Sequence, residues 1–148
     1  MIALDTNLLV YAHRQATREH RAARKAIERA RRSGLGWGVA DAAAVEFFAV
    51  VTHPAAAGRP SSPVEAAAFL DALATAGARF WTPAQAFATR LVQLAADLRV
   101  IGPRVLDLQI ALTALDNGAT QLWTHDSHFA RVPGLRIVNP LAGQAIGR

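Results

Sequence analysis

Residues 2–12 of the chain read IALDTNLLVYA, and this stretch carries the strongest indication of the fold. Residues 2–4 form a short apolar run that suits a buried strand, and the run stops at the carboxylate of Asp5. Thr6 or Asn7 suits the start of a brief helix that continues to Ala12. In α/β sheets, ligands bind where the carboxyl ends of the strands meet. A strand that ends on an acidic residue and passes directly into a helix therefore predicts an α/β protein with a polar site at that edge.

The rest of the chain alternates between strand-like and helix-like segments. We expect strands at residues 37–40, 79–81, 121–124 and 135–138, and helices at residues 17–32, 41–51, 63–76, 83–98 and 105–115. Thr17, Asp41 and Thr82 are the expected caps of three helices, and Pro63 is the expected first residue of a fourth. The alternation predicts an α/β/α fold in three layers with a central, mainly parallel sheet, in one domain spanning residues 1–148.

Composition excludes several classes of protein. The chain has no cysteine, so neither a disulfide framework nor a thiolate metal site can form. No segment reaches the roughly 18 uninterrupted apolar residues of a membrane span, so we expect a cytoplasmic protein without membrane contact. The net charge is +5 and basic residues gather in residues 14–32, which favours RNA or DNA as partner. Arg14, Arg18 and Arg21 are candidate contacts to an RNA backbone, although such a stretch can equally face solvent.

Three other acidic residues lie in or beside apolar segments, as Asp5 does. Glu46 lies within residues 45–48, Asp107 within residues 105–108, and Asp126 follows residues 121–124. Two like charges about 4 Å apart repel by roughly 4 kcal/mol at an effective dielectric constant of 20, so a cluster of carboxylates needs a cation. Ligand sets made only of oxygen suit Mg²⁺ or Mn²⁺. Each residue alone could be a helix cap, an arginine partner or a turn residue, but one joint site accounts for all four.

Four motifs, in order along the chain, resemble those of PIN-domain ribonucleases and especially of VapC-type toxins. They are residues 5–12 with Asp5, residues 45–47 with Glu46, residues 107–111 with Asp107, and residues 124–129 with Asp126. Residues 132–140 also resemble the end of such toxins, so the resemblance covers nearly the whole chain. It implies a PIN-like fold and a Mg²⁺-dependent endoribonuclease, the toxin of a type II toxin–antitoxin module.

The resemblance also assigns roles to residues. The candidate catalytic and metal-ligating residues are Asp5, Glu46, Asp107 and Asp126, with Asp5 and Asp107 as direct ligands of Mg²⁺, for which Mn²⁺ can substitute. Asn7 and Thr124 match positions that orient the carboxylates. The implied partners are an RNA substrate, a cognate antitoxin that covers the acidic pocket, and a second copy of the chain in a homodimer. Asp41 departs from the Ser or Thr that relatives often carry, and its role stays open.

Two other functions fit parts of the pattern. A phosphatase or phosphoacceptor domain would use Asp5 as nucleophile, but such sites usually need a lysine near the phosphate, and the only lysine is Lys25 in the basic stretch. A non-catalytic RNA-binding or interaction module would leave the acidic residues structural. A zinc site at His125 and His128 lacks further nitrogen or sulfur ligands nearby.

Overall fold

The computed structural model describes residues 1–142, in which strands and helices alternate. The elements are β1 (Ile2–Leu4), α1 (Thr6–His13), α2 (His20–Arg32), β2 (Trp37–Ala40), α3 (Asp41–Thr52), α4 (Pro63–Thr75), β3 (Arg79–Trp81), α5 (Phe87–Asp97), the 3₁₀ turn η1 (Gly102–Arg104), α6 (Val105–Asp116), β4 (Gln121–Trp123) and β5 (Arg136–Val138). The strands lie in the order β3-β2-β1-β4-β5, and every neighbouring pair is parallel. The predicted parallel α/β sheet is thus confirmed. The predicted domain of residues 1–148 extends past this part of the chain, because residues 143–148 lie outside the described residues.

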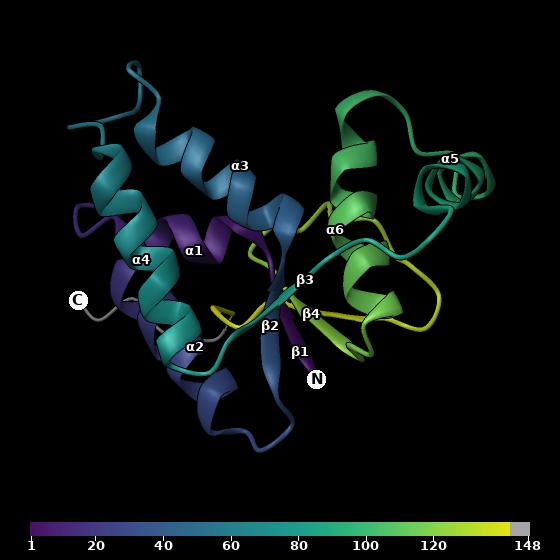
Figure 1. Cartoon of the computed structure of the whole chain (residues 1–148), viewed down its shortest axis with the longest axis horizontal. Helices are drawn as coiled ribbons and strands as arrows, with labels where there is room; N and C mark the ends of the chain where they lie inside the picture. The colour runs from purple at the N-terminus through teal and green to yellow at the C-terminus, as the bar shows by residue number, and fades with distance from the viewer. Residues whose placement is uncertain (143–148) are drawn as a thin grey trace.

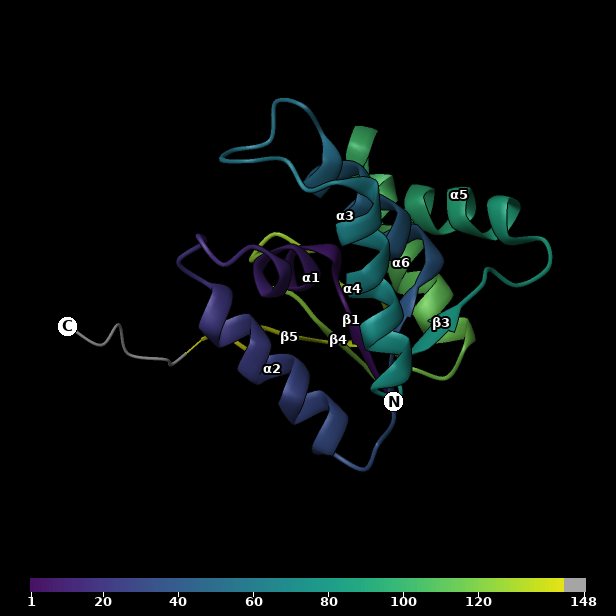
Figure 2. The same ribbon diagram turned by 60° about the vertical axis from the view of Figure 1, so that its left-hand side comes forward.

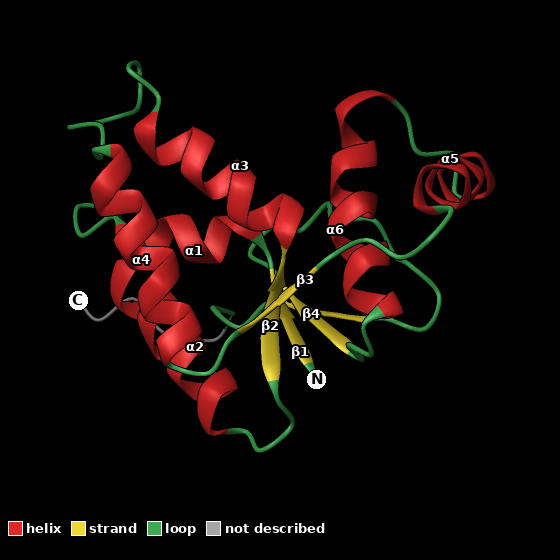
Figure 3. Ribbon diagram, viewed as in Figure 1, coloured by secondary structure: helices red, strands yellow, loops and turns green. Residues whose placement is uncertain are grey.

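Helices cover both faces of the sheet. Figure 1 shows α1, α2 and α4 on one side of the strands and α5 and α6 on the other, and Figure 3 shows the strands as the layer between these two groups. On the first side α1 packs against α2 and α3, and α3 packs against α4; on the second side α5 packs against α6. No helix within residues 1–142 has the length and apolar character needed to cross a membrane.

The parallel strands end at one edge of the sheet. The chain starts at the lower end of β1 in Figures 1 and 2, and α1 begins at the opposite end of that strand. Leu4, the last residue of β1, lies opposite Trp123, the last residue of β4. The next residues along the two strands, Asp5 and Thr124, therefore emerge side by side at the carboxyl edge. This register is what brings the first and fourth sequence motifs together.

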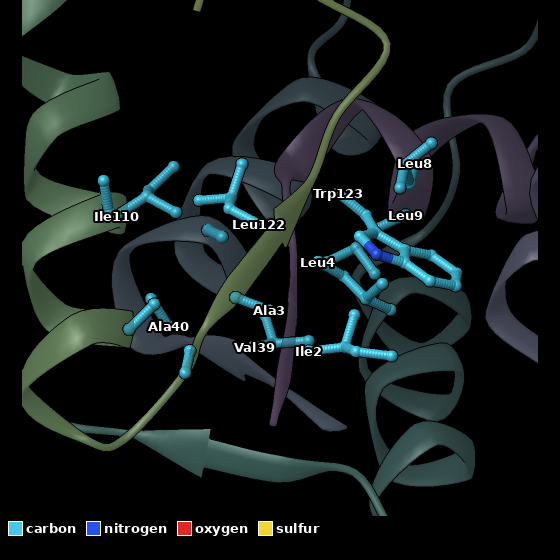
Figure 4. Close-up of a cluster of buried hydrophobic side chains, with 14 of the residues drawn as sticks. Ile2, Ala3, Leu4, Leu8, Leu9, Val39, Ala40, Ile110, Leu122 and Trp123 are labelled. Atoms are coloured by element: carbon cyan, nitrogen blue, oxygen red, sulfur yellow. The ribbon is translucent and has the colours of Figure 1, made fainter. Parts of the chain in front are cut away.

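Aliphatic side chains of the inner strands fix that register. Ile2, Leu4 and Leu122 are at most 1% exposed, and Figure 4 shows them among buried side chains from β1, β2, β4, α1 and α6. Full burial of one such side chain contributes about 1.5–3 kcal/mol, and a slip by one residue would turn all of them to the other face. Gly38 allows β3 to come close, because an added Cβ would lie 2.5 Å from the Arg79 carbonyl oxygen.

Three predicted helix caps need correction. α2 begins at His20, not at a Thr17 cap, because the Thr17 hydroxyl instead donates a 2.8 Å hydrogen bond to the Arg14 carbonyl and closes a turn. α5 begins at Phe87, since the chain stays irregular after Thr82 until Ala86 adopts a left-handed conformation with φ of 55°. Asp41 is the first residue of α3 and makes no capping hydrogen bond.

The predicted start of α4 is confirmed at Pro63. The Ser62 hydroxyl accepts a hydrogen bond from the Glu65 amide, and the Glu65 carboxylate accepts one from the Ser62 amide. This reciprocal pair satisfies two amides at the end of the helix, and proline at the first position needs no amide partner.

Candidate active site

The four predicted carboxylates line one cavity at the carboxyl edge of the sheet. Its volume is about 320 Å³, and its lining residues are Asp5, Thr6, Asn7, Val10, Tyr11, Glu46, Val50, Asp107 and Asp126. The carboxylates come from four separate places in the fold: the end of β1, the middle of α3, the first turn of α6 and the loop after β4. The fold thus gathers side chains that lie up to 121 residues apart in the sequence.

Asp5 is the most buried of the four, with 6% of its surface exposed. It caps α1: its Oδ1 accepts a 2.8 Å hydrogen bond from the Thr6 amide, which leaves Oδ2 directed to other partners. Burial first, and the charges of Asp107 and Glu46 to a smaller extent, raise the pKa of the Asp5 carboxyl from 3.8 to about 6 against the lowering effect of its hydrogen bonds from Thr124 and Thr6. The metal-free protein therefore holds this carboxylate in an environment that disfavours its charge.

Asn7 and Thr124 fix the position of Asp5, in the places expected from the sequence. The Thr124 hydroxyl donates a 2.7 Å hydrogen bond to Asp5 Oδ2, and Asn7 Nδ2 donates to the same oxygen at 3.1 Å. Asn7 also binds the loop after β4: its Nδ2 donates to the Thr124 hydroxyl and its Oδ1 accepts from the His125 amide. These contacts leave Asp5 little freedom to rotate, as an oriented metal ligand requires.

Glu46 faces Asp5 from α3. Its Oε2 accepts a 2.6 Å hydrogen bond from the Thr6 hydroxyl, so the residue after Asp5 positions a second carboxylate of the cavity. The sequence did not single out Thr6 for this role. A hydroxyl directly after the acidic residue at the end of a strand was the signal available.

Asp107 and Asp126 both contact the guanidinium of Arg104, a residue that the sequence did not single out. Arg104 Nη1 lies 3.2 Å from Asp107 Oδ2 and 3.1 Å from Asp126 Oδ2. Burial raises the pKa of the Asp107 carboxyl, while its hydrogen bond from Arg104 lowers that pKa. The other oxygen of Asp126 accepts a 2.8 Å hydrogen bond from the His128 amide, which ties the carboxylate to its loop. The spacing of three residues between Arg104 and Asp107 on one helical turn was the available sequence signal.

The side-chain atoms that line the cavity are of the type that a hard divalent cation prefers as ligands. Four carboxylates supply only oxygen, the ligand type that Mg²⁺ and Mn²⁺ take. A cation would offset both causes of the raised pKa of Asp5, burial of the carboxylate and, to a smaller extent, repulsion from Asp107 and Glu46. Within residues 1–142, no three carboxylate or imidazole groups converge closely enough to hold an ion as they stand. An ion held directly by three of these carboxylates therefore requires some side chains to rotate, whereas Mg²⁺ that keeps several waters needs only one or two of them.

The remaining candidates lie away from the cavity. Arg14 donates hydrogen bonds to the carbonyl oxygens of Val51, Ala57 and Arg59, so it holds the loop after α3. Arg18 and Arg21 are exposed and do not line the cavity. Asp41 at the start of α3 is also outside the lining.

Lys25 bears on the phosphatase alternative. It lines a different cavity of about 580 Å³, between α2 and α4, whose walls are mostly apolar and also carry Arg24, Arg31 and Glu28. The acidic cavity itself has no lysine in its lining. A phosphate bound at Asp5 would thus lack the ammonium partner that phosphoacceptor chemistry usually uses.

Comparison with known proteins shows the family to which the chain belongs. A model of the PIN domain family matches residues 2–135. Ribonuclease VapC43 of Mycobacterium tuberculosis is 37% identical over 145 residues, which cover 97% of this chain and 98% of the relative. Ribonuclease VapC48 of the same species is 28% identical over 145 residues, which cover 94% of this chain and 97% of the relative.

Solved structures with lower identity share the fold. VapBC2 from Rickettsia felis, bound to a DNA fragment from its promoter, has a TM-score of 0.66 and 21% identity, covering 94% of this chain and 98% of the matched chain. VapC20 of Mycobacterium tuberculosis, described as a toxin that cleaves the sarcin-ricin loop, has a TM-score of 0.64 and 10% identity, covering 87% of this chain and 92% of the matched chain.

Proposed function

This chain belongs to the PIN domain family as a VapC-type ribonuclease, and from that premise we propose that it hydrolyses RNA phosphodiester bonds in a Mg²⁺-dependent reaction as a cytoplasmic toxin. The observation that carries the proposal is the gathering of Asp5, Glu46, Asp107 and Asp126 around one cavity. Asp5 and Asp107 would hold the cation directly, and Glu46 and Asp126 would complete its surroundings directly or through water. Mn²⁺ would substitute, because it takes the same oxygen ligands.

The residues of the cavity have separable tasks in this reaction. When bound, a divalent cation supplies Lewis acidity: it makes water more acidic and offsets charge on the phosphate oxygens. Thr124 and Asn7 keep the Asp5 carboxylate oriented toward the cavity, and Thr6 does the same for Glu46. Val10, Tyr11 and Val50 add apolar surface to the lining. The exposed Arg18 and Arg21 are proposed contacts to the RNA backbone, whereas Arg14 is already bound to carbonyl oxygens.

Cleavage of RNA under controlled metal tests this function. The purified protein is expected to cut a pool of RNA oligonucleotides in Mg²⁺ or Mn²⁺ and to lose that activity in EDTA, with 5′ ends mapped by sequencing. Equal cleavage in EDTA would contradict the metal-dependent mechanism. Hydrolysis of a small chromogenic phosphate ester without RNA cleavage would favour a phosphatase, and RNA binding without cleavage would favour a non-catalytic module.

The proposed protein partners are a cognate antitoxin and a second copy of the chain. The antitoxin would cover the acidic cavity with a basic side chain, and the contacts of Arg104 support this, since a guanidinium fits against Asp107 and Asp126. For the homodimer, Val45 on α3 and Leu106 on α6 are 69% and 52% exposed, and α3 packs against α6. Large exposed apolar side chains around one site are typical of interfaces.

Sedimentation velocity tests both partnerships. The chain alone is expected to sediment as a dimer at micromolar concentration, and Val45→Lys is expected to shift it to the monomer. Addition of the antitoxin is expected to give a larger complex that no longer cleaves RNA. A wild-type monomer across this range rejects the dimer, and undiminished cleavage in the complex rejects the covered cavity.

A further inference from the structure

One nitrogen atom of Arg104 contacts three acceptors at the edge of the acidic cavity. Arg104 Nη1 lies 3.1 Å from Asp126 Oδ2, 3.2 Å from Asp107 Oδ2 and 2.9 Å from the carbonyl oxygen of His128. The carboxylates it joins come from α6 and from the loop after β4, which are 19 residues apart. A single positive charge thus balances two carboxylates of the proposed metal site.

The ion pairs of Arg104 with Asp107 and Asp126 can break readily. The Arg104 side chain is 44% exposed, and the side chains of Asp107 and Asp126 are 27% and 34% exposed. Water screens ion pairs at such exposure, so each contributes little and exchanges readily. Arg104 ends the short η1 turn and precedes α6, and its long side chain can swing out without disturbing the helix. The buried Asp5 has no comparable freedom, because three hydrogen bonds hold it.

Resting on the proposed function, we infer that Arg104 is a built-in competitor of the divalent cation: it pairs with Asp107 and Asp126 in the metal-free protein and must release them when the cation binds. The guanidinium holds two repelling carboxylates near each other, so the site stays assembled without metal. The same pairs turn Asp107 and Asp126 toward Arg104, consistent with the finding that no three acidic or imidazole groups of residues 1–142 converge on one point. Arg104 is therefore a positioning residue whose departure accompanies metal binding.

Replacement of Arg104 by glutamine tests this competition through metal affinity. Titration calorimetry with MgCl₂ and MnCl₂ is expected to show about tenfold tighter binding to Arg104→Gln than to wild type, because two partly exposed ion pairs no longer have to break. The control is Arg136→Gln, which removes the same charge from an exposed position. Arg136 is the first residue of β5, so it lies at the amino ends of the strands, opposite the carboxyl ends that carry the cavity. The metal affinity of this control is expected to stay within about twofold of wild type. Equal or weaker binding to Arg104→Gln would overturn the inference.

A second measurement follows Arg104 itself in the wild-type protein. The Arg104 guanidinium resonance, assigned by its absence in Arg104→Gln, is expected to move during a Mg²⁺ titration with the same midpoint as the calorimetry. A resonance that does not move while Mg²⁺ binds would refute the competition and leave the proposed function intact. If neither cation binds to wild type or to either variant, the metal-dependent function itself fails, and the inference fails with it.

Discussion

Replacement of Asp5 by asparagine is expected to abolish RNA cleavage while making the metal-free protein more stable at neutral pH. Asparagine removes a charged ligand from the cavity, and loss of metal-supplied stabilisation worth several kcal/mol lowers the cleavage rate on the order of 10³-fold. The gain in stability has a separate cause, the raised pKa of the buried carboxyl. One substitution thus tests both the catalytic role of Asp5 and the free-energy cost of burying its charge.

The direction of the stability change follows from proton binding. Because burial raises the pKa of Asp5 from 3.8 to about 6, the folded protein binds this proton more tightly than the unfolded chain does. The stability that this proton contributes is fully present below about pH 4 and is lost as the pH rises through about 6. A shift of about two units corresponds to roughly 3 kcal/mol, which is the upper limit of what asparagine recovers above pH 6.

The hydrogen bonds that asparagine loses reduce the expected gain to about 1–2 kcal/mol. Asparagine caps a helix about as well as aspartate, so the bond to the Thr6 amide is kept. The Thr124 hydroxyl already accepts hydrogen bonds from the Asn7 side-chain amide and the Asp126 backbone amide, so it loses its own acceptor when Asp5 Oδ2 becomes an amide nitrogen. The Asn7 amide group is a donor and loses its acceptor at this position, which costs part of the gain.

Urea unfolding of Asp5→Asn and wild type at pH 7.5 and pH 3.5, in EDTA, measures this change. The variant is expected to be more stable at pH 7.5 and slightly less stable at pH 3.5, where the lost hydrogen bonds remain a cost and no charge is removed. Addition of Mg²⁺ is expected to stabilise wild type at pH 7.5 but not the variant. Asp71→Asn, which removes an exposed charge from α4, is the control and is expected to change neither stability nor cleavage. Lower stability of Asp5→Asn at pH 7.5 would show that the hydrogen bonds outweigh the cost of burying the charge.

The sequence predicts the place of Asp5 well because the relevant signals are local. The run from Ile2 to Leu4 marks a strand, and the acidic residue after it marks the strand end. The contact between Asp5 and Thr124 then follows from parallel pairing, which aligns the ends of β1 and β4. Sheet order and site position are thus consequences of short apolar segments that end on polar residues.

Other features depend on distances that no local pattern contains. Thr17 and Thr82 both carry a good cap signal, yet α2 and α5 start later. The Thr17 hydroxyl closes a turn instead of capping a helix, and the chain after Thr82 stays irregular until Ala86. Arg104 reads as one basic residue among many, and its partner Asp126 lies 22 residues farther along the chain. The spacing of Arg104 and Asp107 is visible in the sequence, but only the fold brings Arg104 and Asp126 together.

Replacement of Asp107 by asparagine is expected to lower RNA cleavage on the order of 10³-fold, as for Asp5, but with a different effect on the remaining carboxylates. Mg²⁺ binding is expected to weaken at least tenfold, since a charged ligand becomes neutral. The Asp107 charge is one cause of the raised pKa of Asp5, but burial is the largest. The pKa of Asp5 is therefore expected to fall only part of the way from about 6 towards 3.8 in this variant.

Carbon-13 NMR of the Asp5 carboxyl during a pH titration, together with RNA cleavage and Mg²⁺ calorimetry, checks each part of this prediction. Asp97→Asn is the matched control, because it neutralises an exposed carboxylate on α5 that is hydrogen-bonded to Gln93 and lies outside the cavity. Wild-type cleavage by Asp107→Asn would remove Asp107 from the set of metal ligands. An Asp5 pKa that returns fully to 3.8 would mean that repulsion between carboxylates, not burial, sets the charge cost of the site, and the cation would then be needed mainly to separate like charges. If the pKa stays raised, the cation also compensates for the loss of water around Asp5, which ties metal binding to the buried end of β1.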